Sequence, residues 1–122
     1  MSTPVLLADC VFVVTTNQHY EKIAKNDILY LQAEGSWVDI VTVERTYRLS
    51  TNLGSVEPQL DADYFGRVSR RHVVNLHHVN ALRGNQLFVH GIEILIGKQY
   101  REGLLSRLPI LRTKLIKLSQ SQ

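Results

Sequence analysis

The amino-acid sequence predicts an all-β domain of about ten mainly antiparallel strands, with one short helix between two strand groups and a helical segment at the C-terminal end. Three observations predict this class. Short apolar segments recur at close spacing, short turns rich in Gly and Asn separate several of them, and only two stretches have the spacing of an amphipathic helix. Connections this short favour antiparallel neighbours, because parallel strands need a long crossover.

The two strand groups are defined by apolar runs with alternating or continuous patterning. The first group covers residues 11–15, 20–23, 28–33, 37–43 and 47–50, and the second covers residues 65–69, 72–76, 79–83, 86–90 and 92–96. The turn dipeptides between segments are Asn17-Gln18, Gly35-Ser36, Gly84-Asn85 and His90-Gly91. Glycine in three of these dipeptides supplies backbone conformations that other residues resist.

The helix between the strand groups is predicted over residues 53–60. Leu53, Val56 and Leu60 follow helical spacing there, and Asn52 is a suitable N-cap. Pro58 limits the length or the regularity of this helix, because proline lacks a backbone N–H.

A second helical stretch begins near Lys98. Its apolar stripe consists of Tyr100, Leu104, Leu105 and Leu108, and resumes after Pro109 with Leu111, Leu115, Ile116 and Leu118. Because Pro109 interrupts the stripe, we expect a broken helix. The chain is accordingly divided into an N-terminal segment (residues 1–10), one domain (11–108) and a C-terminal helical extension (109–122).

Length and composition exclude several classes of protein. The 122 residues suffice for one ordinary globular domain. No apolar run approaches the roughly 20 residues that a membrane-spanning helix needs, and the N-terminus lacks the features of a signal peptide, so we expect a cytoplasmic protein without a membrane partner. The single cysteine, Cys10, cannot form an internal disulfide or a thiolate metal site, and is expected to pack as a small apolar side chain.

Charge is distributed unevenly along the chain. Residues 1–65 contain nine acidic and four basic side chains, whereas residues 66–122 contain ten basic and two acidic ones. Such an asymmetry indicates a surface that faces a polyanion, because clustered positive charge binds nucleic acid through the release of counterions. The alternative for the C-terminal part of this charge is a solvated helix face, formed by Arg107, Arg112, Lys114 and Lys117.

The sequence carries no recognisable catalytic motif. It has no phosphate-binding loop, no paired-glycine nucleotide motif, no nucleophile elbow and no metalloprotease motif. His77 and His78 are adjacent, so on a strand they face opposite sides and cannot both bind one ion with His72. Asp61 and Asp63 are expected to be solvated turn residues, since no nucleophile lies near them. We therefore expect no enzyme, no metal and no cofactor.

The most unusual segment is residues 65–75, where Arg67, Arg70 and Arg71 occupy three of five positions between two predicted strands. Guanidinium groups suit phosphate oxygens and the guanine edge in the major groove, whereas a purely structural cluster needs carboxylates, of which few are local. Two further candidate surfaces are Glu34-Gly35-Ser36-Trp37, in a loop, and Lys98-Gln99-Tyr100-Arg101, after the last strand, with Tyr100 turned inward.

Several motifs occur together in one order. They are Asp27-Ile28-Leu29-Tyr30-Leu31 with Ala33-Glu34-Gly35, the helix at 53–60, the set Phe65, Arg67, Arg70, Val74 and Asn75, and the closing Ile96-Gly97-Lys98-Gln99-Tyr100-Arg101. In this order and spacing, residues 11–108 resemble the LytTR family of bacterial DNA-binding domains. The resemblance implies an elongated β domain that inserts loops, and no recognition helix, into successive major grooves of double-stranded DNA, usually bending it.

The resemblance also implies a set of DNA-binding positions: Ser36, Trp37, Arg67, Ser69, Arg70, Arg71, Lys98, Gln99 and Arg101. Several depart from the family pattern, since Ser36 and Trp37 replace asparagine and tyrosine, Ser69 replaces histidine, and Arg71 replaces serine. Replacing a reading side chain changes which base edges can be hydrogen-bonded, so the target sequence does not carry over from relatives.

Three of the residues have alternative roles. Arg67 either contacts DNA or folds back to pair with Glu34 or Asp39 and brace the loop. Trp37 either stacks on DNA or fills the core, as its large apolar area allows both. Asn75 either reads a base or hydrogen-bonds backbone at a strand end, and the second role is expected because its short amide suits turns.

The sequence thus predicts a sequence-specific DNA-binding transcriptional regulator. The family implies paired short repeats as its target and a homodimer on DNA. Family members commonly carry an N-terminal receiver domain, for which the residues before Val11 leave no space, so signal input is expected from elsewhere, for example from a signalling protein partner. The alternative is a protein-interaction module, in which a sheet edge or the C-terminal apolar stripe docks a partner and the basic surface is incidental.

Overall fold

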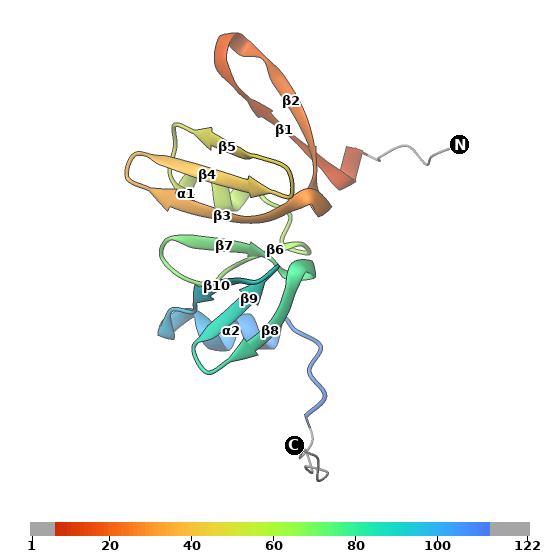
Figure 1. The fold of residues 1–122 in the computed structure, drawn as a ribbon, viewed down its shortest axis with the longest axis vertical. Coiled ribbons are helices and arrows are strands. Elements are labelled where there is room, and N and C mark those ends of the chain that lie inside the picture. Colours follow the sequence, from red (N-terminus) through yellow and green to blue (C-terminus); the bar gives the residue numbers. More distant parts are fainter. Residues whose placement is uncertain (1–6, 113–122) are drawn as a thin grey trace, which may run out of the picture.

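Three antiparallel sheets lie one after another along the long axis of the molecule (Figure 1). The computed structural model describes residues 7–112. A hairpin of β1 (Cys10–Val14) and β2 (Tyr20–Ala24) forms the first sheet. The central sheet has the order β5-β4-β3-β7-β6, from β3 (Ile28–Glu34), β4 (Trp37–Thr42), β5 (Thr46–Leu49), β6 (Phe65–Arg67) and β7 (His72–Asn75). The third has the order β10-β9-β8, from β8 (Val79–Arg83), β9 (Gln86–Val89) and β10 (Ile92–Leu95).

The predicted strands are confirmed. Each of the ten lies within two residues of its expected bounds, and all of their pairings are antiparallel. The turns behave as their composition predicts: Gly35 in the β3–β4 turn has φ = +57°, a backbone conformation that glycine adopts without steric cost.

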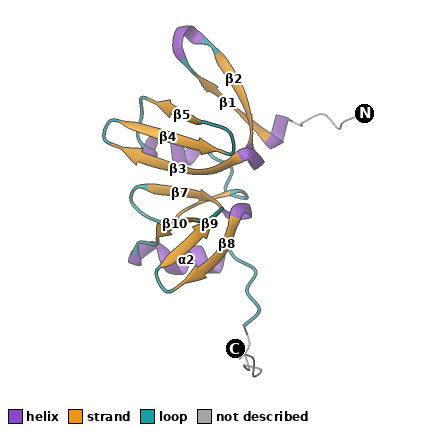
Figure 2. Cartoon of the chain, viewed as in Figure 1, coloured by secondary structure: helices purple, strands orange, loops and turns teal. Residues whose placement is uncertain are grey.

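The helices are shorter than predicted, and they flank the strands (Figure 2). In place of one helix over residues 53–60, α1 (Leu53–Val56) is followed by a 3-10 turn, Glu57–Gln59. Pro58 lies at the start of that turn, where its missing N–H costs no hydrogen bond. The predicted cap is confirmed, because the Asn52 side chain accepts a hydrogen bond of 2.9 Å from the Ser55 amide.

The C-terminal helical segment is also shorter. A 3-10 turn, Lys98–Tyr100, leads into α2 (Arg101–Ser106), and residues 109–112 are not helical. The prediction of a helical extension over residues 109–122 is therefore wrong for residues 109–112. Pro109 ends the helix because a proline disfavours helical backbone in the residue before it. The remainder of the predicted extension, residues 113–122, lies outside the described residues. The remaining 3-10 turns are Leu7–Asp9, Thr16–Gln18, Lys25–Asp27 and Leu76–His78.

Each face of the central sheet carries a cluster of buried side chains. The cluster toward the β1–β2 hairpin and α1 contains Val13, Ile23, Ile28, Leu31, Val38, Ile40, Leu53, Phe65 and Val73. The cluster toward the third sheet and α2 contains Leu29, Val68, Val74, Leu87, Val89, Ile94, Ile96 and Leu104. A register shift in β3 between Ile28 and Tyr30 lets the consecutive residues Leu29 and Tyr30 both pack in the second cluster, while Ile28 and Leu31 pack in the first. The loops at the ends of this sheet are thus held by two cores.

The expectation for the single cysteine is met. Cys10 is buried, with 7% of its surface exposed, as expected for a small apolar side chain. None of the helices within residues 7–112 is long and apolar enough to cross a membrane.

Candidate functional site

The three loops singled out in the sequence lie along one edge of the molecule, at the left of Figure 1. They are the β3–β4 turn, the β6–β7 loop and the segment between β10 and α2. Backbone hydrogen bonds tie them together: the Ala33 amide donates to the Arg71 carbonyl at 2.8 Å, and the Gly97 amide donates to the Val68 carbonyl at 2.7 Å. A Cβ atom at Gly97 would lie 3.0 Å from the Tyr100 ring and 3.6 Å from Cα of Ser69, so glycine permits this close approach.

Arg67 braces the β6–β7 loop from within. Its guanidinium donates to the Ser69 carbonyl at 2.7 Å, to the Arg70 carbonyl at 2.8 Å and to Oε1 of Glu57 at 2.6 Å. Its side chain is only 21% exposed, and its Cζ lies 5.8 Å from the Tyr100 ring centre. The bracing role considered for Arg67 is therefore present, but its expected partners, Glu34 and Asp39, were wrong, because the 3-10 turn after α1 brings Glu57 to this place.

Arg71 joins the second loop to the first. Its Nε and Nη2 donate to the Ala33 carbonyl at 3.2 and 3.1 Å, and Nη2 also lies 2.9 Å from Oε2 of Glu34. Few carboxylates are local to the arginines in the sequence, but the fold brings two of them close. Glu34 and Glu57, distant in sequence, neutralise Arg71 and Arg67 respectively.

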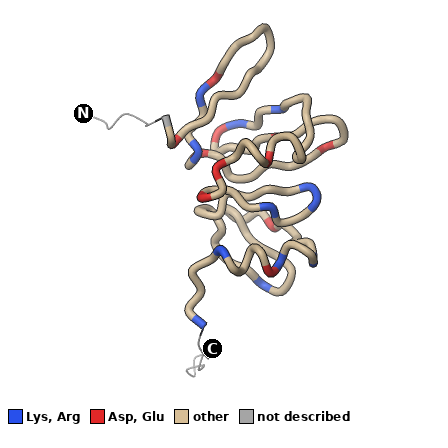
Figure 3. The backbone as a smooth tube through the Cα atoms, turned by 180° about the vertical axis from the view of Figure 1, so that it is seen from behind, with Lys and Arg blue, Asp and Glu red and all other residues tan. Residues whose placement is uncertain are grey.

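Arg70 differs from its two neighbours. It is exposed, and its guanidinium has no hydrogen bond or ion pair with any residue between positions 7 and 112. Only its carbonyl is engaged, as an acceptor from Arg67. The backbone of Arg70 is thus fixed while its charge is available, and Figure 3 shows basic residues gathered on this loop.

Ser69 and His72 close the base of the same loop. Oγ of Ser69 lies 2.9 Å from Nδ1 of His72 and accepts a hydrogen bond of 3.2 Å from the Arg71 amide. Burial lowers the pKa of the half-buried His72, and the positive charge of Arg71 lowers it further, against an opposing effect of Glu34. The Ser69 side chain is therefore occupied inside the loop.

The first loop presents Ser36 and Trp37. Ser36 is exposed, and Trp37 is 40% exposed, which excludes the core-filling alternative. The guanidinium of Arg48, on β5, lies 4.6 Å from the indole ring centre and is held by Asp39 through hydrogen bonds of 2.7 and 2.9 Å. These hydrogen bonds keep the pKa of Asp39 below its usual value. Arg48 was not among the residues predicted from the sequence. The only signal for this contact in the sequence is that Asp39 and Arg48 have opposite charges and lie on adjacent predicted strands.

The third loop presents Lys98 and Gln99. Both are exposed, and neither side chain has a hydrogen-bond or ion-pair partner in the described part of the chain. Arg101 instead donates to the Gly84 carbonyl in the β8–β9 turn, and Tyr100 is half-buried under Arg67, so it points inward as predicted. Lys98 and Gln99 are therefore the available groups of this loop.

Asn75 has the structural role predicted for it. It is fully buried, its amide donates to the carbonyls of Lys25 and Ile28 at 3.1 and 2.8 Å, and its Oδ1 accepts from the His77 amide at 2.9 Å. This side chain joins β7 to the segment before β3, and so fixes the frame that carries the first two loops.

Comparison with known proteins identifies this arrangement. The family model of the LytTr DNA-binding domain matches residues 11–108. The chain belongs to the LytTR family. A solved structure, described as the LytTr DNA-binding domain of a methyl-accepting/DNA response regulator from Bacillus cereus, superposes with a TM-score of 0.71 at 21% sequence identity, over 84% of this chain and 98% of that one. No curated protein sequence matches the chain. The LytTR assignment makes this chain a DNA-binding domain, and the solved structure confirms its fold.

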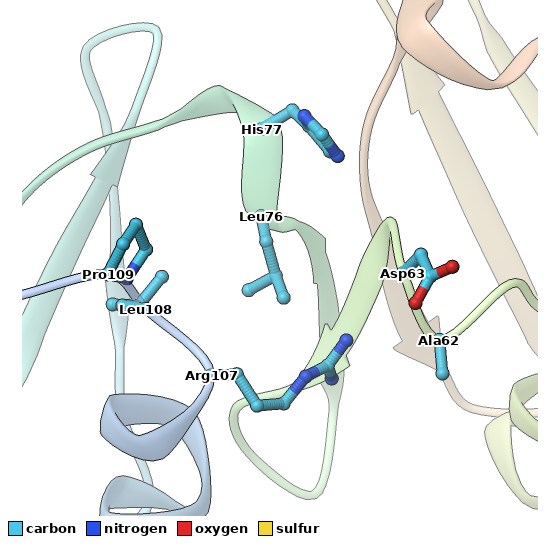
Figure 4. A pocket seen from close by; sticks show the side chains of 7 residues that line it. All are labelled: Ala62, Asp63, Leu76, His77, Arg107, Leu108 and Pro109. Atoms are coloured by element: carbon cyan, nitrogen blue, oxygen red, sulfur yellow. The ribbon is translucent and has the colours of Figure 1, made fainter.

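One groove of the LytTR domain lies away from these loops. It has a volume of about 490 Å³ and is lined by Ala62, Asp63, Leu76, His77, Arg107, Leu108 and Pro109 (Figure 4). Nη1 of Arg107 is already bound to the Phe65 carbonyl at 2.9 Å. Within residues 7–112, His, Cys, Asp and Glu form no group of three that could hold a metal ion. The groove contains none of the predicted site residues.

From the lowered pKa of His72 we expect the stability of the LytTR domain to depend on pH. Because the unfolded state takes up this proton first as the pH falls below the ordinary value of 6.5, the free energy of unfolding decreases from about pH 7.5 to 5.5. Urea unfolding at both pH values measures the decrease, and His72→Gln should remove part of it. His19→Gln, which removes an exposed imidazole, is the control. An equal pH dependence in wild type and His72→Gln would contradict the prediction.

Proposed function

We propose that this LytTR domain is the sequence-specific DNA-binding part of a transcriptional regulator, and that it inserts its three loops into successive major grooves. One observation carries the proposal. The loops lie on one edge, their backbones are joined by hydrogen bonds, and they present side chains that have no hydrogen-bond or ion-pair partner among residues 7–112: Ser36, Arg70, Lys98 and Gln99. A rigid backbone that presents unpaired polar groups suits base recognition, since little freedom is lost on binding.

The predicted site residues divide into two kinds under this proposal. Arg70, Lys98, Gln99 and Ser36 reach the DNA, with Trp37 stacking beside them. Arg67, Ser69, Arg71 and Arg101 hold the loops, because their polar groups are already bound within the protein. Phosphate contacts position the protein, whereas the available groups on the loop tips carry the sequence information.

The family resemblance motivates the proposed target and assembly. We propose paired short repeats as the target, one domain on each repeat, and a signalling protein that controls access to DNA. Sedimentation of the protein with a duplex containing two sites measures the number of bound copies. Two copies per duplex are expected, and one copy would contradict the paired arrangement.

Selection from a randomised duplex library at near-physiological salt tests the proposed function. The enriched duplex and a scrambled version are then titrated at several salt concentrations. We expect a preference of about a thousandfold or more for the enriched sequence, and an affinity that falls as salt rises. A library that enriches no motif, together with binding that salt does not weaken, would contradict the proposal.

One observation favours a protein contact as a second function. Phe12, Val14 and Tyr20, on the β1–β2 hairpin, are 54%, 51% and 64% exposed. Val14 and Tyr20 are directly paired across the two strands, so they form a contiguous apolar patch. A partner bound there would stay bound at high salt, unlike DNA.

A further inference from the structure

The stacked pair of Trp37 and Arg48 points to a role that the family assignment does not supply. Resting on the proposed function, we propose that Arg48 is a positioning residue, which holds the indole of Trp37 as a fixed stacking surface for the DNA. Arg48 lies on β5, whereas Trp37 is the first residue of β4 and Asp39 is two residues further along. The three side chains come together because Asp39 and Arg48 are direct partners in the β4–β5 register.

The carboxylate of Asp39 fixes the plane of the guanidinium. Nε and Nη2 of Arg48 donate to its two oxygens at 2.7 and 2.9 Å, a paired contact that allows one orientation. The Asp39 side chain is only 15% exposed, so this anchor is itself well packed. The guanidinium is then held 4.6 Å from the indole ring centre. One face of the indole is therefore covered by a guanidinium group whose orientation is fixed by Asp39.

The Trp37 and Arg48 side chains are also partly exposed to solvent. Trp37 remains 40% exposed, and the Arg48 side chain is 54% exposed. Nη1 of Arg48 has no hydrogen-bond partner among residues 7–112. An aromatic surface next to an unpaired N–H suits a DNA strand, in which a base or sugar meets the ring while a phosphate oxygen meets the guanidinium. Lysine would keep the charge but lose the planar stack and the paired contact.

The pair is connected to the Arg70 loop by a row of polar side chains. Across the central sheet, Asp39 is opposite Gln32, and Gln32 is opposite His72, whose ring contacts Ser69. Gln32 donates to Glu34 at 2.6 Å, and Glu34 pairs with Arg71. Trp37 and Arg48 thus lie on the same polar strip as the second loop, and one DNA molecule can contact both.

Trp37 is the chain's single tryptophan, so its fluorescence reports on this site alone. The experiment compares the wild type with Arg48→Lys and Asp39→Asn. For the affinity measurements, Trp37→Ala is made alone and in combination with each of these two substitutions. Arg45→Lys is the matched control, because Arg45 also lies over an aromatic ring, that of Tyr47 at 5.6 Å, and pairs with Glu21. Affinity is measured with the selected and the scrambled duplex. Fluorescence and its quenching by iodide are measured in the variants that retain Trp37.

We expect the selected duplex to shield Trp37 from iodide in the wild type. Arg48→Lys should weaken binding to the selected duplex by about tenfold, with a smaller loss on the scrambled one. Asp39→Asn should cause a loss of the same kind, and Arg45→Lys no loss. In the Trp37→Ala background, Arg48→Lys should have little further effect, because the two residues act together. Unchanged thermal unfolding midpoints confirm that the variants fold.

Three results would overturn the role of Arg48. The first two are additive losses from Arg48→Lys and Trp37→Ala, and equal losses on both duplexes, which indicate a phosphate contact alone. Wild-type binding that leaves iodide quenching unchanged would overturn it too. These outcomes differ from failure of the proposed function, in which the wild type itself does not distinguish the selected from the scrambled duplex.

Discussion

Replacing Arg70 with alanine is expected to weaken binding to the selected duplex by about 1–3 kcal/mol, and to relax the preference for one base pair. Arg70 is the only arginine of the β6–β7 loop whose guanidinium has no partner within residues 7–112. Its removal leaves no buried carboxylate unpaired, so the stability of the protein should hardly change. Titration of matched duplexes that differ at single base pairs measures the effect.

Arg45→Ala is the control for the loss of one exposed positive charge. Arg45 lies in the β4–β5 turn, at the opposite end of β4 from Trp37. Arg45→Ala should leave the preference for the selected duplex over its single-base-pair variants unchanged. If Arg70→Ala lowers the affinity for every duplex equally and reduces the salt dependence, Arg70 contacts a phosphate and does not read a base.

Replacing Asn75 with alanine is expected to lower the free energy of unfolding by about 2–4 kcal/mol. The fully buried side chain makes three hydrogen bonds to backbone groups, and alanine leaves the carbonyls of Lys25 and Ile28 and the amide of His77 without these partners. Buried polar groups without partners are costly because water cannot replace the lost hydrogen bond. Urea denaturation measures the change.

Asn80→Ala provides the comparison for Asn75. Asn80 is exposed and accepts one hydrogen bond, of 2.9 Å, from the His90 amide. Its replacement should cost less than about 1 kcal/mol, because water takes over the lost contact. Equal losses in the two variants would show that burial of Asn75 contributes nothing to stability.

The strands were predictable because each is a local pattern. An alternation such as Ile92, Ile94 and Ile96 can be recognised without knowing what it packs against. The N-cap at Asn52 and the positive φ at Gly35 are equally local. The end of the C-terminal helix was less predictable, since the apolar stripe continues past Pro109 although the helix ends at Ser106.

The sequence identified the three candidate loops, but not the contacts that their side chains make in the folded chain. Arg67, Arg70 and Arg71 look alike in the sequence, and their roles differ because carboxylates distant along the chain reach two of them. Which carboxylate pairs with which arginine depends on the strand order and on the turn after α1. Neither can be predicted from the spacing of charged residues along the sequence. Arg48 was not predicted for the same reason, because its contacts with Asp39 and Trp37 depend on the β4–β5 register.

The separation between fixed loop backbones and unpaired loop side chains has a consequence for how such domains diverge. Among the described residues, Ser36, Arg70, Lys98 and Gln99 contribute no side-chain hydrogen bond to the fold, while Arg67, Gly97 and Asn75 maintain it. Substitutions at the first four positions are therefore nearly neutral for folding. Under the proposed function, a duplicated gene can change the DNA sequence that its product binds by one mutation at a time without passing through an unfolded intermediate, and the same four positions are the natural choice for a library of retargeted variants.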